Sequence, residues 1–165
     1  MGVWRCVKFT LDRSLEILVA GLMAVLVLDV TWQVTTRYVL GDPSSWTEEL
    51  AVFLLIWVGL LGAGVALRQR AHVGIDYFVL KMSPAGRRLT ECIAFLSTAL
   101  FSALVLVYGG SVLVVQTYAL EQVSPALGIQ MGVVYLALPI SGLFLTLYSV
   151  ELLLESLAAP RTGES

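Results

Sequence analysis

The sequence predicts an all-α integral membrane protein with four transmembrane helices, a short amphipathic interfacial helix between helices two and three, and both termini in the cytoplasm. Hydrophobic residues make up 58% of the 165 residues and charged residues only 13%, about half the charged share of an average soluble domain. The mean hydropathy is +0.88. A chain of this size that lacks the residues for a charged surface is not a soluble domain, and its composition also excludes disorder, collagen and a disulfide scaffold.

The first two helices are predicted at about 15–38 and 50–67. Each stretch is close to the length of about 20 apolar residues that a spanning helix needs, since lipid offers the backbone no hydrogen-bond partners. The basic segment 1–13 resembles the start of a signal peptide. The apolar stretch after it is too long, however, and residues 31–33 form no small-residue cleavage site. We therefore predict that the first helix is retained.

A tight turn at 42–45 joins these two helices on the outer side. Ser45 followed by Glu48 has the spacing of a capping box, in which the two side chains satisfy free amides of the first helical turn. Glu48 and Glu49 also lie at the positive end of the helix dipole. The neighbouring Trp46 suits the headgroup belt of a membrane.

The connection between helices two and three has the pattern of a short amphipathic helix that lies on the membrane surface. Its apolar residues recur at i, i+3, i+4 and i+7, namely Ile75, Phe78, Val79 and Met82. Ser83 and Pro84 then have the N-cap and N1 signature of the third helix, predicted at about 89–118. This stretch exceeds a typical span, so we expect the helix to tilt or to protrude from the bilayer.

The fourth helix is predicted at about 131–154 and is followed by a tail at 156–165. Pro139 leaves the carbonyl of Tyr135 without its usual partner, which predicts a kink. Ahead of this helix, Ser124 and Pro125 predict the start of a short interfacial turn.

The basic residues predict the orientation. Of the ten Lys and Arg residues, all but Arg37 fall in the N-terminal segment, the connection between helices two and three, or the tail. Positive residues are retained on the cytoplasmic side, so both termini are predicted there. With a net charge of −2 there is no basic excess for binding nucleic acid.

Three polar residues share one face of the first helix. Asp29, Gln33 and Arg37 are spaced i, i+4 and i+8. An ionised carboxylate near mid-bilayer is costly, so Asp29 is expected to face protein or water. Arg37 is expected to pair with Glu48 or Glu49 across the outer turn. The seam is interpreted as a structural feature that fixes helix packing or holds a partner subunit; an ion or substrate path is the alternative.

Small residues in the second helix predict close packing. Gly59 with Ala63, and Gly62 with Ala66, have the small-xxx-small spacing that lets helices approach closely. A functional hinge at these glycines is the alternative interpretation.

His72 and Asp76 are spaced i, i+4 if the connection is helical. They are interpreted as interfacial structure, with a pH sensor or a partner contact as the alternative. A metal site needs more ligands. Because the chain carries no Ser/His/Asp arrangement, paired-cysteine motif or metal cluster, we expect neither enzymatic activity nor a cofactor.

Several strings, in order, make the chain resemble a known family. They are 32–34 (WQV), 37–41 (RYVLG), 46–51 (WTEELA), 62–68 (GAGVALR) followed by 71–76 (AHVGID), and 135–140 (YLALPI). Together they resemble the small permease subunit of tripartite ATP-independent periplasmic (TRAP) transporters, the DctQ-like family. The likeness extends over most of the chain, and no catalytic residue is carried over with it.

The resemblance implies a division of labour in a bacterial inner membrane. A large membrane subunit carries the sodium-coupled substrate site and moves as an elevator, while a soluble periplasmic binding protein captures an organic acid. The small subunit would pack beside the large one as a non-catalytic scaffold and help to dock the binding protein transiently. Its partners would be these two proteins and the lipid bilayer.

Two other functions stay open at this stage. One is a self-contained four-helix exporter, coupled to protons through Asp29. The other is a membrane enzyme or quinone protein, against which the absence of paired cysteines and the single histidine count. The scarcity of ionisable groups inside the membrane disfavours the exporter.

Overall fold

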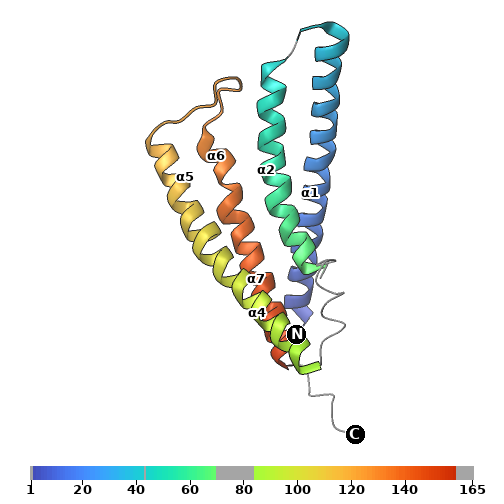
Figure 1. Ribbon diagram of the computed structural model, residues 1–165, viewed down its shortest axis with the longest axis vertical. Coiled ribbons are helices and arrows are strands. Elements are labelled where there is room, and N and C mark those ends of the chain that lie inside the picture. Colours follow the sequence, from blue (N-terminus) through green and yellow to red (C-terminus); the bar gives the residue numbers. More distant parts are fainter. Residues whose placement is uncertain (1, 43, 70–83, 159–165) are drawn as a thin grey trace.

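The computed structural model describes residues 2–42, 44–69 and 84–158, which form a helical bundle (Figure 1). Within this part the only extended pairing is an isolated bridge between Val123 and Gln130. The helical elements, in chain order, are α1 (Gly2–Thr35), the π-helical η1 (Thr36–Leu40), α2 (Ser45–Arg68), α4 (Pro84–Phe101), the π-helical η2 (Ser102–Gly109), α5 (Gly110–Ala119), α6 (Met131–Tyr135) and α7 (Ala137–Ala158). The all-α prediction is confirmed for the described residues.

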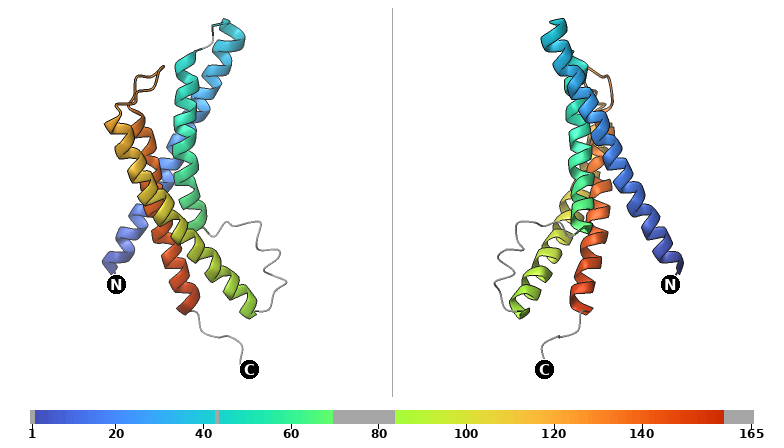
Figure 2. Two further views of the ribbon diagram at one scale, coloured as in Figure 1. Left: turned by 60° about the vertical axis from the view of Figure 1, so that its left-hand side comes forward. Right: turned by 90° about the vertical axis from the view of Figure 1, so that its right-hand side faces the viewer.

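The elements pack as two helical hairpins that cross. In the first hairpin α1 packs on α2, and in the second α4, η2 and α5 pack on α6 and α7. The hairpins meet where α2 packs on α7, and they diverge toward the other end of the bundle (Figures 1 and 2). We call the diverging end, with residues 40–42, 44–45 and 119–131, the hairpin end. The opposite end, where α1 and α4 begin and α2 and α7 end, is the terminal end.

In the described part of the chain, four helical stretches are long and apolar enough to cross a membrane. They are Thr10–Leu40, Ser45–Arg68, Arg88–Ala119 and Met131–Ala158. The share of the most apolar window that is buried inside the chain ranges from 6% in the first stretch to 39% in the last. Much of the apolar surface of these helices, and most on the first stretch, is therefore left for lipid or a partner to cover.

The helix boundaries differ from the prediction mainly at the start of the chain. Helix α1 begins at Gly2, well before the apolar stretch expected from about residue 15. Hydropathy reports only the part of a helix that suits lipid, whereas polar residues continue the same helix. The third span does begin at Pro84, as predicted, and continues without interruption to Ala119.

The predicted capping box at Ser45 is wrong, because the N-cap lies one residue earlier and makes no capping hydrogen bond. Helix α2 begins at Ser45, so the N-cap is Ser44, and the Ser44 side chain does not cap an amide. Its hydroxyl instead lies 2.8 Å from the hydroxyl of Thr47, which also donates to the Ser44 carbonyl at 2.8 Å. The side chains of Ser44 and Thr47 thus bond to each other and to a carbonyl instead of capping the first helical turn. Thr47 is fully buried.

The predicted irregularity at Pro139 is confirmed. Helix α6 ends at Tyr135 and α7 begins at Ala137, with a turn at Leu136 between them. Gly110 of α5 packs against this break: a Cβ placed on Gly110 would lie 2.8 Å from the Leu138 Cβ and 3.1 Å from the Pro139 Cδ. A larger residue at 110 would therefore push the second hairpin apart.

The first hairpin turns on a left-handed glycine. The widened π-helical turn η1 ends at Gly41, whose φ is +70°. This conformation strains residues with a side chain, which is why glycine commonly ends a helix. The next amide, of Asp42, donates to the carbonyl of Thr36 at 3.2 Å and so closes the end of the helix.

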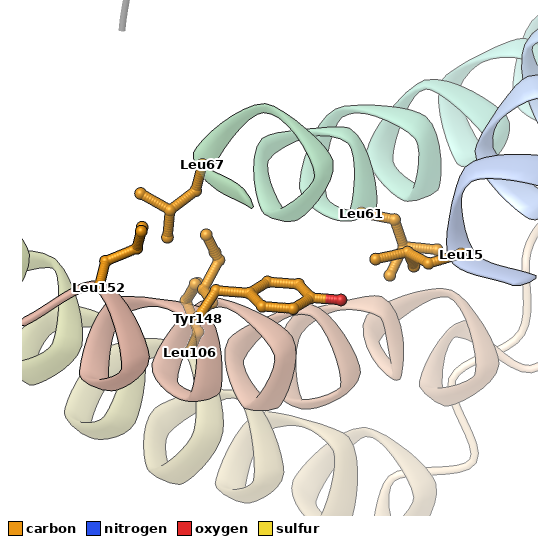
Figure 3. Packing of buried hydrophobic residues seen from close by; sticks show 7 residues of the cluster. Leu15, Leu61, Leu67, Leu106, Tyr148 and Leu152 are labelled. Carbon is orange, nitrogen blue, oxygen red and sulfur yellow. The ribbon is translucent and has the colours of Figure 1, made fainter. Parts of the chain in front are cut away.

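The interior of the bundle lies toward the terminal end. Its buried side chains come from α1, α2, η2 and α7: Leu15, Leu61, Leu67, Leu106, Leu145, Tyr148 and Leu152. In Figure 3 the ring of Tyr148 extends between these leucines, and its hydroxyl points toward the side where Leu15 and Leu61 lie. In lipid, apolar burial gives little drive for helices to associate, so close packing and polar contacts become decisive.

Candidate functional site

The terminal end contains a polar network centred on Arg68. The Arg68 Nε lies 3.0 Å from the Asp12 Oδ2, and its Nη1 lies 2.8 Å from the Glu16 Oε1. Tyr148 donates its hydroxyl to the other Asp12 oxygen at 2.7 Å. We call these four residues the Arg68 network.

The Arg68 network joins three helices. Asp12 and Glu16 come from α1, Arg68 from the last turn of α2 and Tyr148 from α7. The Asp12 side chain is 5% exposed, whereas that of Arg68 is 31% exposed. A carboxylate so deeply buried needs a charged or hydrogen-bonding partner, and Asp12 has both.

Sequence reasoning missed this network. From the sequence, Arg68 was used for the orientation and as part of the family string 62–68, and no role was assigned to Asp12 or Tyr148. A signal was present, because Asp12 and Glu16 are spaced i, i+4 and therefore lie on one face of α1. The i, i+4 pair identifies the face but not the arginine that meets it.

At the hairpin end, one carboxylate connects the two hairpins. The Glu49 Oε2 accepts hydrogen bonds from the Ser124 hydroxyl and from the backbone amides of Ala126 and Leu127, each amide at 3.1 Å. Glu49 lies on α2, and its three donors lie in the loop between α5 and α6. Glu49 is half-buried and Ser124 is 3% exposed.

The loop that Glu49 contacts forms the turn expected at Ser124 and Pro125. The Gly128 amide donates to the Ser124 carbonyl at 3.0 Å, and the Leu127 amide also lies 3.2 Å from the Ser124 hydroxyl oxygen. Pro125 has no amide to satisfy. The first free amides of the turn, on Ala126 and Leu127, therefore point at Glu49.

An open hollow of about 550 Å³ lies between the start of α2 and this loop. Glu48 is exposed on it, beside the half-buried Glu49. Consecutive residues of a helix point in different directions, which explains why the two carboxylates have different surroundings. The hollow is lined by Ser45, Glu48, Glu49, Val52, Phe53, Pro125 and Ala126.

The polar residues predicted to form a seam on α1 have different environments. Asp29 is 7% exposed, and among the described residues its Oδ2 finds no hydrogen-bond partner. Gln33 is half-buried and Arg37 is exposed. The helix widens to a π-helix from Thr36, which departs from the 3.6-residue spacing on which the seam was predicted.

The pairing expected for Arg37 is not present. Within the described part of the chain no ion pair joins Arg37 to Glu48 or Glu49. The Arg37 guanidinium lies 5.9 Å from the centre of the Tyr38 ring, within cation–π range. Glu49 is engaged by the loop instead.

The predicted packing glycines of α2 contribute little inside this chain. Gly59 is exposed, and a Cβ there would meet nothing within 4 Å. A Cβ on Gly62 would lie 3.9 Å from the Val19 Cγ1, which is ordinary contact.

Trp46, which was predicted to suit the headgroup belt, is 45% exposed near the start of α2.

His72, Asp76 and the predicted amphipathic helix lie outside the described residues. Within the described ranges, no three His, Cys, Asp or Glu side chains gather closely enough to hold a metal ion.

Residues 26–159 match the family model described as the DctQ component of tripartite ATP-independent periplasmic transporters. The chain is 32% identical to the sialic acid TRAP transporter small permease protein SiaQ of Vibrio cholerae over 136 residues, covering 82% of this chain and 77% of SiaQ. It is 27% identical to the C4-dicarboxylate TRAP transporter small permease protein DctQ of Rhodobacter capsulatus, covering 93% of this chain and 79% of that protein.

A third relative is much longer. The isethionate TRAP transporter permease protein DctMQ of Oleidesulfovibrio alaskensis is 31% identical over 140 residues. This alignment covers 79% of the present chain but only 22% of DctMQ. A unit of this kind therefore also occurs as part of a larger permease polypeptide.

Proposed function

The chain belongs to the DctQ family of tripartite ATP-independent periplasmic transporter components, and we propose that it is the non-catalytic scaffold subunit of such a transporter. It would pack against a large, sodium-coupled elevator subunit and take part in organic-acid uptake across a bacterial inner membrane. The observation that carries this proposal, beyond family membership, is the use of the polar groups. Asp12 and Arg68 are engaged in contacts that join helices, and Glu49 is engaged in contacts that join α2 to the loop of the second hairpin.

Two further observations support a large membrane partner. The first spanning stretch is only 6% buried inside the chain, so lipid or another protein must cover it. The alignment with part of the longer DctMQ also fits a subunit that works beside a larger permease segment. The sialic acid, C4-dicarboxylate and isethionate in the relatives' names are all organic anions, which supports an organic acid as the transported substrate.

The hairpin end is proposed to face the periplasm and to help dock the binding protein. The distribution of basic residues supports this orientation, because Arg37 is the only Lys or Arg among the described residues that lies near the hairpin end. Both chain termini would then be cytoplasmic.

We expect the isolated chain to transport nothing. An affinity-tagged copy, purified from the native membrane, should bring a larger membrane protein with it. Liposomes containing both proteins, supplied outside with a soluble binding protein loaded with its radiolabelled organic acid, should take up that acid, and uptake should require sodium. Uptake into liposomes that contain this chain alone would refute the scaffold proposal.

Replacing Asp29 with asparagine should leave uptake by the complex within about twofold of wild type. Asp29 is 7% exposed and its Oδ2 lacks a partner, so a neutral amide of similar size disturbs little there. A proton-coupled exporter that depends on Asp29 would instead lose all transport while still assembling. Initial uptake rates of Asp29→Asn and wild-type complexes, at equal protein content, decide between the two functions.

A further inference from the structure

We propose that Glu49 is a positioning residue: its carboxylate holds the loop between α5 and α6 in one shape over the start of α2, and the soluble binding protein recognises that shape. The inference rests on the proposed function, because it takes the binding protein as the partner that meets the hairpin end. It goes beyond that function by separating the roles of two adjacent acidic residues, Glu48 and Glu49.

The first support is the convergence of donors on one oxygen. The Glu49 Oε2 accepts from the Ser124 hydroxyl and from the Ala126 and Leu127 amides. Hydrogen bonds to a charged acceptor are about twice as strong as neutral ones. Three donors that converge on one charged atom tie the turn to α2, in addition to the bonds that the turn makes to itself.

The second support is that the loop depends on Glu49 for its attachment to α2. Among the described residues, the hydrogen bonds between the loop and α2 all end on this carboxylate. The loop's other backbone bonds are internal, such as that from the Ser124 amide to the Ile129 carbonyl at 2.9 Å, or run to the adjoining ends of α5 and α6, such as that from the Met131 amide to the Gln122 carbonyl at 2.9 Å. Loss of the Glu49 carboxylate would leave the turn's own hydrogen bonds in place but would free the turn to move relative to α2.

The third support is the location. The hairpins diverge toward the hairpin end (Figure 1), so packing between the two hairpins contributes little there to fixing the loop relative to α2. A partner that binds a mobile loop must pay the entropy of ordering it, which weakens binding. A carboxylate that orders the loop in advance removes that loss.

Glu48 provides a matched control. It has the same charge, is the preceding residue and lines the same hollow, but it is exposed and does not bond the loop. Glu48→Ala therefore changes the surface charge as Glu49→Ala does, without releasing Ala126 and Leu127.

Hydrogen–deuterium exchange on the purified complex of this chain and its large subunit tests the structural step. Glu49→Ala should speed exchange of the Ala126 and Leu127 amides by about tenfold, and Glu49→Gln by less because a neutral amide oxygen still accepts. Glu48→Ala should leave both amides at wild-type rates. Wild-type exchange at 126 and 127 in the Glu49→Ala complex would overturn the proposal.

Binding of the ligand-loaded binding protein to immobilised complex tests the functional step. Glu49→Ala should weaken binding by about three- to tenfold, Glu49→Gln should restore part of it, and Glu48→Ala should change it by less than about twofold. Faster loop exchange with unchanged affinity, or equal losses for Glu48→Ala and Glu49→Ala, would overturn the proposal. Partial rescue by glutamine distinguishes positioning from a direct charge contact, which the neutral residue could not replace.

One comparison separates this inference from the proposed function. In the wild-type complex, the binding protein should protect the loop amides at 121–130 from exchange. Absence of that protection would remove the docking role itself, whatever Glu49 does. Protection that persists in Glu49→Ala, with wild-type affinity, would remove only the role of Glu49.

Discussion

Replacing Arg68 with methionine should lower the free energy of unfolding by about 3 kcal/mol, because it leaves Asp12 buried without its cation. This is the lower end of the range for breaking a buried ion pair, and we choose it because the Arg68 side chain keeps 31% exposure. Methionine fills similar volume, so packing contributes little to the loss. Denaturant unfolding of the purified chain in detergent micelles measures the change.

Arg13 offers a matched control for this experiment. It also pairs with Glu16, at 3.4 Å, but its side chain is 66% exposed. Arg13→Met should therefore cost less than about 1 kcal/mol. Combining Arg68→Met with Asp12→Asn and Glu16→Gln should recover much of the stability, since no buried charge is then left unpaired. Equal losses for Arg68→Met and Arg13→Met would show that the Arg68 network does not stabilise the bundle.

Hydropathy was enough to predict the four spanning helices. A bilayer requires each span to satisfy its own backbone, and that requirement produces long apolar stretches visible in any sequence. The sequence also predicted the break near Pro139, because proline removes a specific hydrogen bond of the helix. Hydropathy did not predict the start of α1 at Gly2, since a helix outside lipid carries no apolar signature.

The polar contacts could be predicted only in part. Asp12 bonds Tyr148 across 136 residues and Glu49 bonds Ser124 across 75 residues, and no local spacing rule reaches that far. Glu49 was chosen as a candidate for its place in the first turns of α2, but its partner was expected to be Arg37. The short distance in sequence favoured that pair, whereas the fold brings the second hairpin to Glu49 instead.

The glycines at helix contacts could likewise be predicted only in part from the sequence. Small-xxx-small spacing selected Gly59 and Gly62, yet among the described glycines the tightest surroundings are those of Gly110, Gly132 and Gly142. Spacing identifies a helix face on which close approach is possible. It does not say whether another helix of the same chain lies against that face.

Gly142→Ala is expected to destabilise the chain by about 2 kcal/mol, within the range for overpacking a tight interior. A Cβ at this position would lie 2.7 Å from the Leu106 Cβ and 3.0 Å from the Val107 backbone nitrogen. A backbone atom cannot rotate away as a side chain can, so α7 and η2 must separate. The hydrogen bond between the Ser102 and Thr146 hydroxyls, 2.8 Å long, joins the same two elements and should weaken with them.

Gly59→Ala is the matched control, because Gly59 also lies inside a helix but a Cβ there meets nothing within 4 Å. In the isolated chain it should be neutral or stabilise by up to about 1 kcal/mol, the difference in helix propensity between glycine and alanine. Thermal unfolding of both variants in the same detergent should therefore shift in opposite directions or differ by several degrees. If Gly142→Ala and Gly59→Ala unfold at the same temperature, η2 can move away from α7 without loss of stability. The close contact between η2 and α7 then does not hold the second hairpin together.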